Sequence, residues 1–267
     1  MFVNRIKVNI TPSQIKNLET PHQENNLPGS INKISNTNFS MPSSNCHEIK
    51  NQEINKILMS RKSPIELFQY YLGSKGFQNF KRIVPINLVY TAKKQDETVV
   101  IKFGFSETSN EYNLLKSLSH KNLPNVYDYY KKNIINDNGE PLKLECFSMQ
   151  YLSGGDLYDF LQNNTISKED AKGIIGELIS VLSYLHANEI IHTDIRPQNI
   201  VFEGNTPYLI DLDSKRINKL QSLDKNNDWK EMGFSIYQIL CKVEGLPDSL
   251  KTRPTSQAEC LRAYNLL

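Results

Sequence analysis

The stretch that most constrains this chain is "IIHTDIRPQNIVF", residues 190–202, which places Asn199 five residues after Asp194. Phosphoryl transfer needs a carboxylate that orients the attacking hydroxyl group and an amide oxygen that helps to hold a metal ion, and a loop with this spacing supplies both. Asp211 follows twelve residues after Asn199, at the end of the apolar run "YLI", where a metal-binding carboxylate is expected. The pattern therefore predicts a phosphoryl-transfer site.

The composition is that of a soluble globular chain whose partners are not selected by net charge. The apolar content of 39% is enough for a packed core, and 31 basic against 29 acidic residues leave a charge of only +2. No overall field recruits nucleic acid or an anionic membrane, and no apolar run is long enough to cross a bilayer. The four cysteines are widely spread and form no metal-ligand cluster. We expect a monomer in a reducing cytoplasm that binds neither nucleic acid nor membrane.

The first sixty residues have a different composition from the rest of the chain. They contain eleven asparagines but only two aromatic residues, with Pro, Ser and Gln between them. Such a segment cannot bury enough surface to offset its ordering entropy, so residues 1–60 are predicted to be mostly disordered. One interpretation is a linker or tail. The other is an uncleaved bacterial secretion leader of the type III kind, which Ser/Asn-rich N-termini resemble.

From about residue 62 the sequence has the periodicity of regular structure. "PIELFQYYLG" is predicted to be helical, "INLVYTA" and "ETVVIKFG" are predicted strands around the turn "KKQD", and "KLECFSMQYL" is another strand. "SNEYNLLKSLSH" has helical spacing, and a long helix is predicted to begin with a capping box from Ser167 to Asp170. Strands come first and helices follow. This order predicts an α+β fold with a sheet-rich N-lobe over 61–150 and a helical C-lobe over 151–267.

In this order, residues 83–267 resemble a protein kinase domain. "VVIK" resembles the strand whose lysine holds the α- and β-phosphates of ATP, and "NEYNLLKSLSHKNLPNV" resembles the helix whose glutamate pairs with that lysine. "FSMQYLSGGDL" resembles the hinge that faces adenine, "NDWKEMGFSIYQIL" resembles the central helix, and "RPTSQAECL" resembles the closing helix. The resemblance implies a two-lobed kinase fold that uses ATP and Mg²⁺.

The resemblance also implies a role for each candidate site residue. The catalytic candidates are Asp194 as the base, Lys102 with its partner Glu111, and Arg196 at the position of a phosphate-contacting lysine. The nucleotide candidates are Lys102, Met149 guarding the back pocket, the backbone from Gln150 to Tyr151, and Asp156 near the ribose. The metal candidates are Asn199, Asp211 and Asp213. In this scheme Asp228 braces the catalytic loop.

The phosphate loop is the first departure from the family pattern. The loop before the strand "LVYTA" is "RIVPIN", which contains no glycine and carries Pro85. Glycine permits close approach of the backbone to phosphates, so we expect weaker nucleotide binding or more dependence on Lys102 and metal. The glycines of "LGSKGF" lie too far upstream, Gly73 being 29 residues before Lys102, and Gly73 is predicted to cap a helix.

The other departures concern the regulatory segment. Thr193 stands where many kinases have an arginine that reads a phosphate, so no phosphorylation switch is expected. Asp228 follows Asp211 by only 17 positions and no "APE" element lies between them, which predicts a shortened activation segment without the usual peptide platform. Asp213 stands where the family has glycine. It is either a further magnesium ligand or a solvated turn residue.

The sequence therefore predicts a minimal kinase domain over 61–267, with Ser or Thr of a protein as the phosphate acceptor. Its size, short segment and leader resemble effector kinases that pathogenic bacteria deliver into the host cytoplasm, such as the HopBF type, which acts on the host's ninety-kilodalton heat-shock chaperone. Two rivals remain. A small-molecule kinase of the aminoglycoside or choline type also lacks the peptide platform, and a pseudokinase that only binds partners fits the missing glycines.

Overall fold

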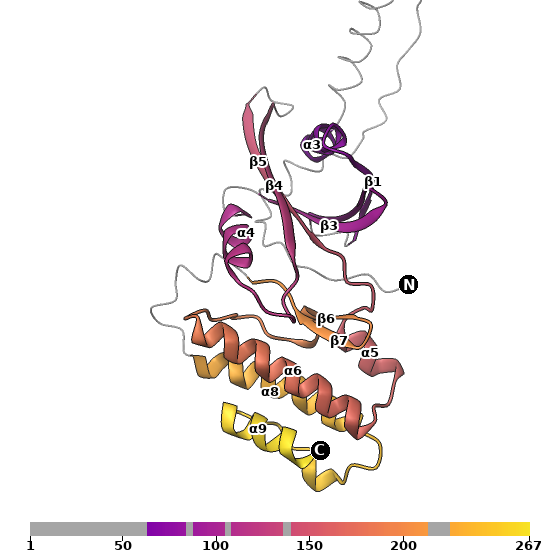
Figure 1. Ribbon diagram of the computed structural model, residues 1–267, viewed down its shortest axis with the longest axis vertical. Helices are drawn as coiled ribbons and strands as arrows, with labels where there is room; N and C mark the ends of the chain where they lie inside the picture. Colours follow the sequence, from indigo (N-terminus) through magenta and orange to yellow (C-terminus); the bar gives the residue numbers. More distant parts are fainter. Residues whose placement is uncertain (1–62, 84–87, 105–107, 136–139, 213–224) are drawn as a thin grey trace, which may run out of the picture. The chain divides into compact units, whose positions relative to one another are not determined.

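The computed structural model describes most of the chain that follows the predicted leader (Figure 1). The described residues are 63–83, 88–104, 108–135, 140–212 and 225–267. The predictions for the leader 1–60, for Pro85, for Asp213 and for the rest of 214–224 fall outside these residues.

Among the described elements, five strands come before the long helices, which is the order that the sequence predicted. The helices are α3 (Pro64–Gly73), α4 (Thr108–Ser117), α5 (Leu157–Asn163), α6 (Lys168–Ala187), α8 (Lys225–Cys241) and α9 (Gln257–Leu266), with short 3-10 turns η1 (Pro197–Asn199) and η3 (Asp248–Leu250). The strands are β1 (Phe77–Arg82), β2 (Val89–Lys94), β3 (Glu97–Gly104), β4 (Val126–Ile135), β5 (Pro141–Gln150), β6 (Ile200–Glu203) and β7 (Thr206–Leu209).

A five-stranded sheet in the order β1-β2-β3-β5-β4 forms the N-lobe. The hairpin β2–β3 is closed by the pair Lys94 and Glu97, with Gln95 and Asp96 between them at φ values of 49° and 66°. Two successive residues with positive φ are the signature of the tight turn that matches strand twist, so the predicted turn "KKQD" is confirmed. The sheet begins with β1 at Phe77, before "INLVYTA", which is the first strand that the sequence predicted.

Strand β3 is central to this sheet because it pairs with β2 on one side and β5 on the other. All six residues from Val99 to Gly104 are buried. A continuous apolar run is what a strand covered on both faces requires, and Lys102 is the one cation within it. Burying a charged lysine there costs free energy unless carboxylates compensate its charge, so Lys102 is expected to have acidic partners.

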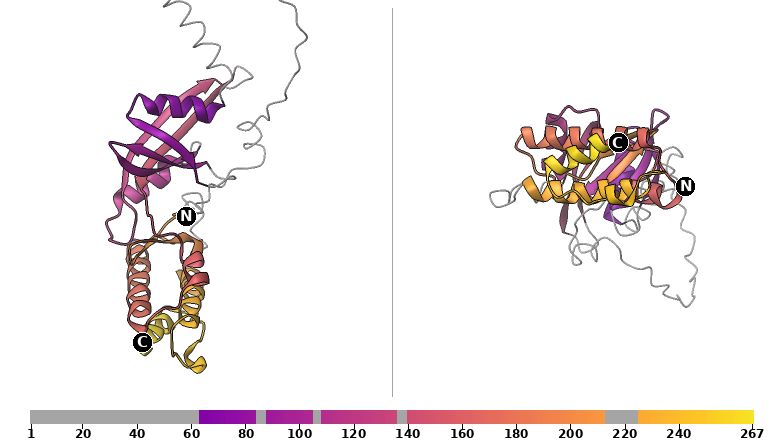
Figure 2. Two further views of the ribbon diagram at one scale, coloured as in Figure 1. Left: turned by 90° about the vertical axis from the view of Figure 1, so that its right-hand side faces the viewer. Right: turned by 90° about the horizontal axis from the view of Figure 1, so that it is seen from below.

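The C-lobe is built on α6, α8 and α9, which pack against one another (Figure 2). Helix α6 begins as predicted, since the Ser167 hydroxyl oxygen accepts the Asp170 N–H at 3.0 Å. The capping box is not reciprocal, because the Asp170 carboxylate accepts from the Ser167 hydroxyl rather than from its backbone. Fully buried Leu178, Leu182 and Leu185 then form the stripe that faces the core.

A glycine in α8 lets the segment before α9 lie directly on that helix. A Cβ atom added at Gly233 would lie 1.9 Å from the carbonyl oxygen of Pro254, closer than atoms can approach. Glycine costs about 1 kcal/mol of helix propensity relative to alanine. Glycine is needed at this position despite that cost, because any larger residue would push the "RPT" segment away from α8.

Helix α3 belongs to a separate compact unit, together with the end of β4 and the start of β5. It starts at a full capping box, in which Ser63 and Glu66 satisfy each other's backbone N–H groups. Ile65 and Phe68 are buried, as its amphipathic pattern predicted, whereas Leu67 and Tyr71, which were also expected to be buried, are only half-buried. Leu72 is buried as well. The prediction that Gly73 caps this helix is wrong. Gly73 is its last helical residue and Ser74 is the cap, with an ordinary right-handed φ of −67°.

Candidate active site

In the part of the chain that the structure describes, Lys102 contacts Glu111, the partner that the resemblance implied, and also Asp211. Lys102 comes from β3, Glu111 from the first turn of α4, and Asp211 from the segment after β7. The Nζ atom of Lys102 donates to Glu111 Oε1 at 2.7 Å and to Asp211 Oδ1 at 2.8 Å. All three side chains are at least nine-tenths buried. One ammonium group thus links β3 to the neighbouring helix α4 and to a segment 109 residues later in the chain.

The charges of this cluster favour the protonated lysine. Burial alone would lower the pKa of Lys102, but the carboxylates of Asp211 and Glu111 outweigh that effect and raise the pKa above its usual 10.5. Two carboxylates against one lysine leave a net negative charge in a dry environment, which a further cation would balance.

The loop that carries Asp194 is held by the side chain of Asn199. Asn199 ends the short turn η1, and its Nδ2 atom donates to the Asp194 carbonyl oxygen at 2.8 Å and to Asp194 Oδ2 at 3.1 Å. The Asp194 side chain is 28% exposed, so its carboxylate can be reached from solvent. Arg196 lies beside it, with Nε 3.7 Å from Asp194 Oδ2. The predicted catalytic residues Asp194 and Arg196 are therefore neighbours, and Asn199 fixes the loop between them.

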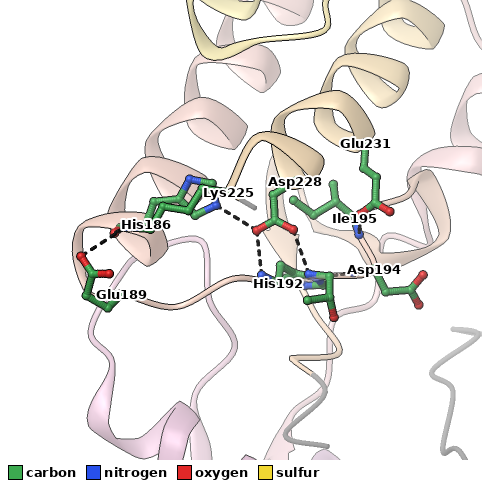
Figure 3. A network of polar contacts seen from close by, with 9 residues as sticks. His186, Glu189, His192, Asp194, Ile195, Lys225, Asp228 and Glu231 are labelled. Carbon is green, nitrogen blue, oxygen red and sulfur yellow. Dashed lines mark hydrogen bonds and ion pairs between the residues drawn. The ribbon is translucent and has the colours of Figure 1, made fainter. Parts of the chain in front are cut away.

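Asp228 braces this loop from α8, as the resemblance implied (Figure 3). Its Oδ2 atom accepts the His192 N–H at 2.8 Å and its Oδ1 atom accepts the Thr193 N–H at 2.9 Å. Thr193 has a φ of 69°, a left-handed conformation that a β-branched residue rarely adopts. Two charge-assisted hydrogen bonds from a fully buried carboxylate supply the support that such strain needs.

The imidazole of His192 links the loop to the strand that precedes Asp211. Its Nε2 atom bonds the Ile210 carbonyl oxygen at 2.9 Å, and its Nδ1 atom accepts the Asp194 N–H at 3.4 Å. This pattern needs the neutral ring with the proton on Nε2. Burial lowers the pKa of His192 even though Asp228, Asp211 and Asp194 favour its charged form. The neutral ring is thus part of the site's architecture.

We therefore expect the free energy of unfolding to fall as the pH drops below about 6.5, the ordinary pKa of histidine. The pKa of His192 is lower in the folded protein, so the unfolded chain binds the extra proton first. The loss has a slope of up to about 1.4 kcal/mol per pH unit. Urea unfolding at pH 5.5 and 7.5 measures it. His192→Gln keeps a donor for Ile210 but cannot titrate, so its slope should be smaller. Equal slopes in the two proteins would contradict the assignment.

Asn199 and Asp211 are suited to hold a divalent metal ion. The Oδ1 atom of Asn199 is buried and has no hydrogen-bond partner among the described residues. A buried amide oxygen normally has a partner, and amide and carboxylate oxygens are ligands that Mg²⁺ accepts. No group of three or more His, Cys, Asp or Glu within the described ranges could hold a metal. The predicted ligands Asn199, Asp211 and Asp213 include only two acidic residues and rely on ATP phosphates for the rest, so they do not need such a group.

Comparison with known families agrees with this geometry. Residues 79–244, more than half of the chain, match the protein kinase domain. The chain belongs to the protein kinase family. Members of that family use ATP and a divalent metal.

Several of the curated relatives that the chain matches are named as serine/threonine-protein kinases. Human death-associated protein kinase 2 is 33% identical over 144 residues, covering 51% of this chain and 36% of that protein. CBL-interacting serine/threonine-protein kinase 21 of Arabidopsis thaliana is 30% identical over 143 residues, covering 51% and 32%. Serine/threonine-protein kinase shk1/pak1 of Schizosaccharomyces pombe is 31% identical over 146 residues, covering 52% and 20%. The matched region thus spans 20–36% of these relatives.

The kinase hinge follows β5, where Met149 pairs with Val100 of β3. Met149 is 4% exposed, in keeping with a residue that closes the back of a pocket. Gln150 ends the strand, and its N–H donates to the Asn125 carbonyl oxygen at 2.8 Å. The Gln150 N–H, one of the backbone groups predicted to face adenine, is therefore already bonded to Asn125. The prediction now rests on the Gln150 carbonyl and on Tyr151.

Asp156 has a structural task besides its predicted place near the ribose. It is 3% exposed, and its Oδ1 atom accepts the Asp159 N–H at 2.8 Å as the N-cap of α5. Capping accounts for its burial without any ligand. Ribose binding by Asp156 stays a prediction.

Sequence reasoning missed two residues that hold the site together. Asn122 donates from Nδ2 to Glu177 of α6 and to the Pro207 carbonyl oxygen of β7, both at 2.7 Å, which fixes the strand leading to Asp211. The other missed residue is Glu231 of α8, whose Oε2 atom accepts the Ile195 N–H at 3.0 Å. The "HKN" stretch gave a signal for Asn122. Nothing in the sequence distinguished Glu231 from a surface charge.

No helix in the described part of the chain is long and apolar enough to span a membrane.

Proposed function

We propose that this chain transfers the γ-phosphoryl group of ATP, with Mg²⁺, to a Ser or Thr hydroxyl of a protein substrate. The observation that carries the proposal is the junction at Lys102, whose ammonium group reaches Glu111 at 2.7 Å and Asp211 at 2.8 Å. A chain that only binds partners has no use for a buried lysine shared by two carboxylates beside an accessible Asp194, because burying such charges is costly.

The residues divide the chemistry between them. Lys102, positioned by Glu111, binds the α- and β-phosphates, while Asn199 and Asp211 hold the metal, which supplies charge stabilisation at the phosphates when bound. Asp194 accepts the proton of the attacking hydroxyl group. Arg196, 3.7 Å from Asp194, contacts the transferred phosphate, for which a guanidinium group is as good a donor as an ammonium group.

The decisive experiment incubates the purified chain with γ-labelled ATP, Mg²⁺ and host-cell lysate, and then maps the modified residue by mass spectrometry. Phosphoserine or phosphothreonine on a protein supports the proposal. Phosphotyrosine as the main product, or labelling of a small molecule alone, would overturn it. A thermal-shift measurement with ATP and Mg²⁺ separates a nucleotide-binding enzyme from a pseudokinase that does not bind ATP.

A finer proposal is that the chain is a type III effector that acts on a folded host protein such as the ninety-kilodalton heat-shock chaperone. Its support is the Asn-rich composition of residues 1–60 and the 17-residue interval between Asp211 and Asp228. A segment that short cannot form a peptide platform, so the substrate has to be recognised outside the usual cleft. The purified chaperone is the first candidate for the labelling assay, and absence of label on it would sink this part of the proposal.

The enzyme is expected to be active without phosphorylation of residues 214–227. Thr193 precedes Asp194 where an arginine would read such a phosphate, and its backbone is already fixed by Asp228. Protein treated with phosphatase should keep its rate within about twofold of untreated protein, since no charge-assisted contact is lost. A large loss after dephosphorylation would contradict this.

Residues 1–60 are expected to serve delivery and not catalysis. A chain that begins at Arg61 should fold and phosphorylate substrate, whereas one that begins after Gly76 lacks the buried residues Ile65, Phe68 and Leu72 and should be insoluble. In a bacterium with a type III apparatus, the full-length chain should reach the host cytoplasm and the Arg61 chain should stay behind. Equal delivery of both chains would refute the leader, and loss of catalysis would move the domain boundary.

A further inference from the structure

The four consecutive N–H groups from His192 to Ile195 all have acceptors, and three of these acceptors lie on two carboxylates of α8. Asp228 accepts from His192 and Thr193 at 2.8 and 2.9 Å. Glu231 accepts from Ile195 at 3.0 Å. Residues three apart lie on the same face of a helix, so the two carboxylates approach the loop side by side (Figure 3).

The bond to Glu231 acts on the peptide group that follows Asp194. The carbonyl oxygen of this group belongs to Asp194 and accepts from Asn199 Nδ2 at 2.8 Å. Its N–H belongs to Ile195 and donates to Glu231 Oε2 at 3.0 Å. Because a peptide group is planar, one bond at each end fixes its orientation. Asn199 and Glu231 together therefore fix the backbone from which the Asp194 side chain projects.

Without Glu231 this fixation is incomplete on one side. Asp228 holds the residues before Asp194, and the Asp194 N–H makes only a long bond of 3.4 Å to the His192 ring. Arg196 follows Ile195 directly, so the same N–H also anchors the start of the segment that carries the guanidinium group. Rotation of the Asp194–Ile195 peptide would move both functional side chains at once.

We infer that Glu231 is a positioning residue of the phosphoryl-transfer site, which holds Asp194 and Arg196 in their reactive arrangement through the Ile195 N–H. This inference rests on the proposed kinase activity. Glu231 touches neither substrate nor nucleotide in this role. Its loss should lower kcat and leave the KM for ATP nearly unchanged, because the interaction aligns the acid–base group rather than binding ATP.

The test uses two substitutions of nearly equal length and helix propensity in the full chain. Glu231→Gln keeps an oxygen acceptor for Ile195, whereas Glu231→Met removes it. We expect the glutamine variant to keep kcat within about threefold and the methionine variant to lose about 10–100-fold, the scale of a small misplacement of catalytic groups. The KM for ATP should stay within about threefold in both. Lys230→Met, at the exposed neighbouring position, is the matched control and should leave kcat unchanged.

A second measurement separates this inference from the proposed function. Amide hydrogen exchange at Ile195 should be slow in the parent and in Glu231→Gln, and at least about tenfold faster in Glu231→Met, because the N–H loses its acceptor. An inactive parent would refute the kinase activity, while the exchange rates would still decide whether Glu231 holds the peptide. An active parent with an equally active Glu231→Met variant would overturn the inference. Should the methionine variant fail to fold, Glu231→Asp, one methylene group too short to reach Ile195, takes its place with the same expected loss.

Discussion

Replacing Asp194 with alanine is expected to lower the rate of phosphoryl transfer by about 10²–10⁴-fold, the usual range for removal of a positioned acid–base group. The fold should remain intact, because the side chain is 28% exposed and the backbone N–H groups on both sides of it stay bonded to Asp228 and Glu231. Initial rates with labelled ATP measure the first effect. The melting temperature measures the second and should change by no more than a few degrees.

Asp248→Ala is the matched control for this substitution. The Asp248 side chain is 95% exposed and pairs with Lys251, three residues away, so its removal should leave the rate unchanged. An Asp194→Ala variant that labels substrate as fast as the parent would show that Asp194 is not the base.

The parts of the fold that the sequence predicted are those with a strong local signal. The apolar run "ETVVIKFG" predicts a strand, and the resemblance implies a glutamate partner for the Lys102 that it carries. The spacing of Asp194, Asn199 and Asp211 predicts the order of the catalytic loop and the metal-binding segment, but not the β6–β7 hairpin between them. Tertiary contacts followed from resemblance, and the structure brings Glu111 and Asp228 to the places it implied.

Other parts carried no such signal. Strands β1 and β4 were missed because they hold many polar and half-exposed residues, so their alternation is weak. Gly73 was taken for a helix cap on residue type alone, but a serine served as well where no left-handed φ was needed. Glu231 was invisible because its importance depends on a backbone N–H 36 residues earlier in the chain. Periodicity within α8 cannot reveal a partner in a loop.

Replacing Asp211 with asparagine is expected to remove Mg²⁺-dependent activity, with a loss of at least about 10³-fold, because a carboxylate that helps to neutralise charge at the transferred phosphate is replaced by a neutral amide. The asparagine keeps the shape of the side chain and can still contact Lys102. Loss of the charged partner should lower the free energy of unfolding by about 1.5–3 kcal/mol. The loss is limited because Lys102 retains Glu111 at 2.7 Å. Initial rates over a range of Mg²⁺ concentrations and urea unfolding measure the two effects.

The companion substitution Asp213→Asn shows whether a second carboxylate shares the metal with Asp211. Mg²⁺ accepts one or two carboxylates together with phosphate oxygens. If Asp213 is a ligand, its substitution should raise the Mg²⁺ concentration needed for half-maximal rate by about tenfold or more, in line with the loss of one coordinating group. An effect within about twofold would make Asp213 a turn residue. An Asp211→Asn variant that keeps the parent's rate at low Mg²⁺ would refute the metal role of Asp211, and with it the assignment of Lys102 and Asp211 to one catalytic centre.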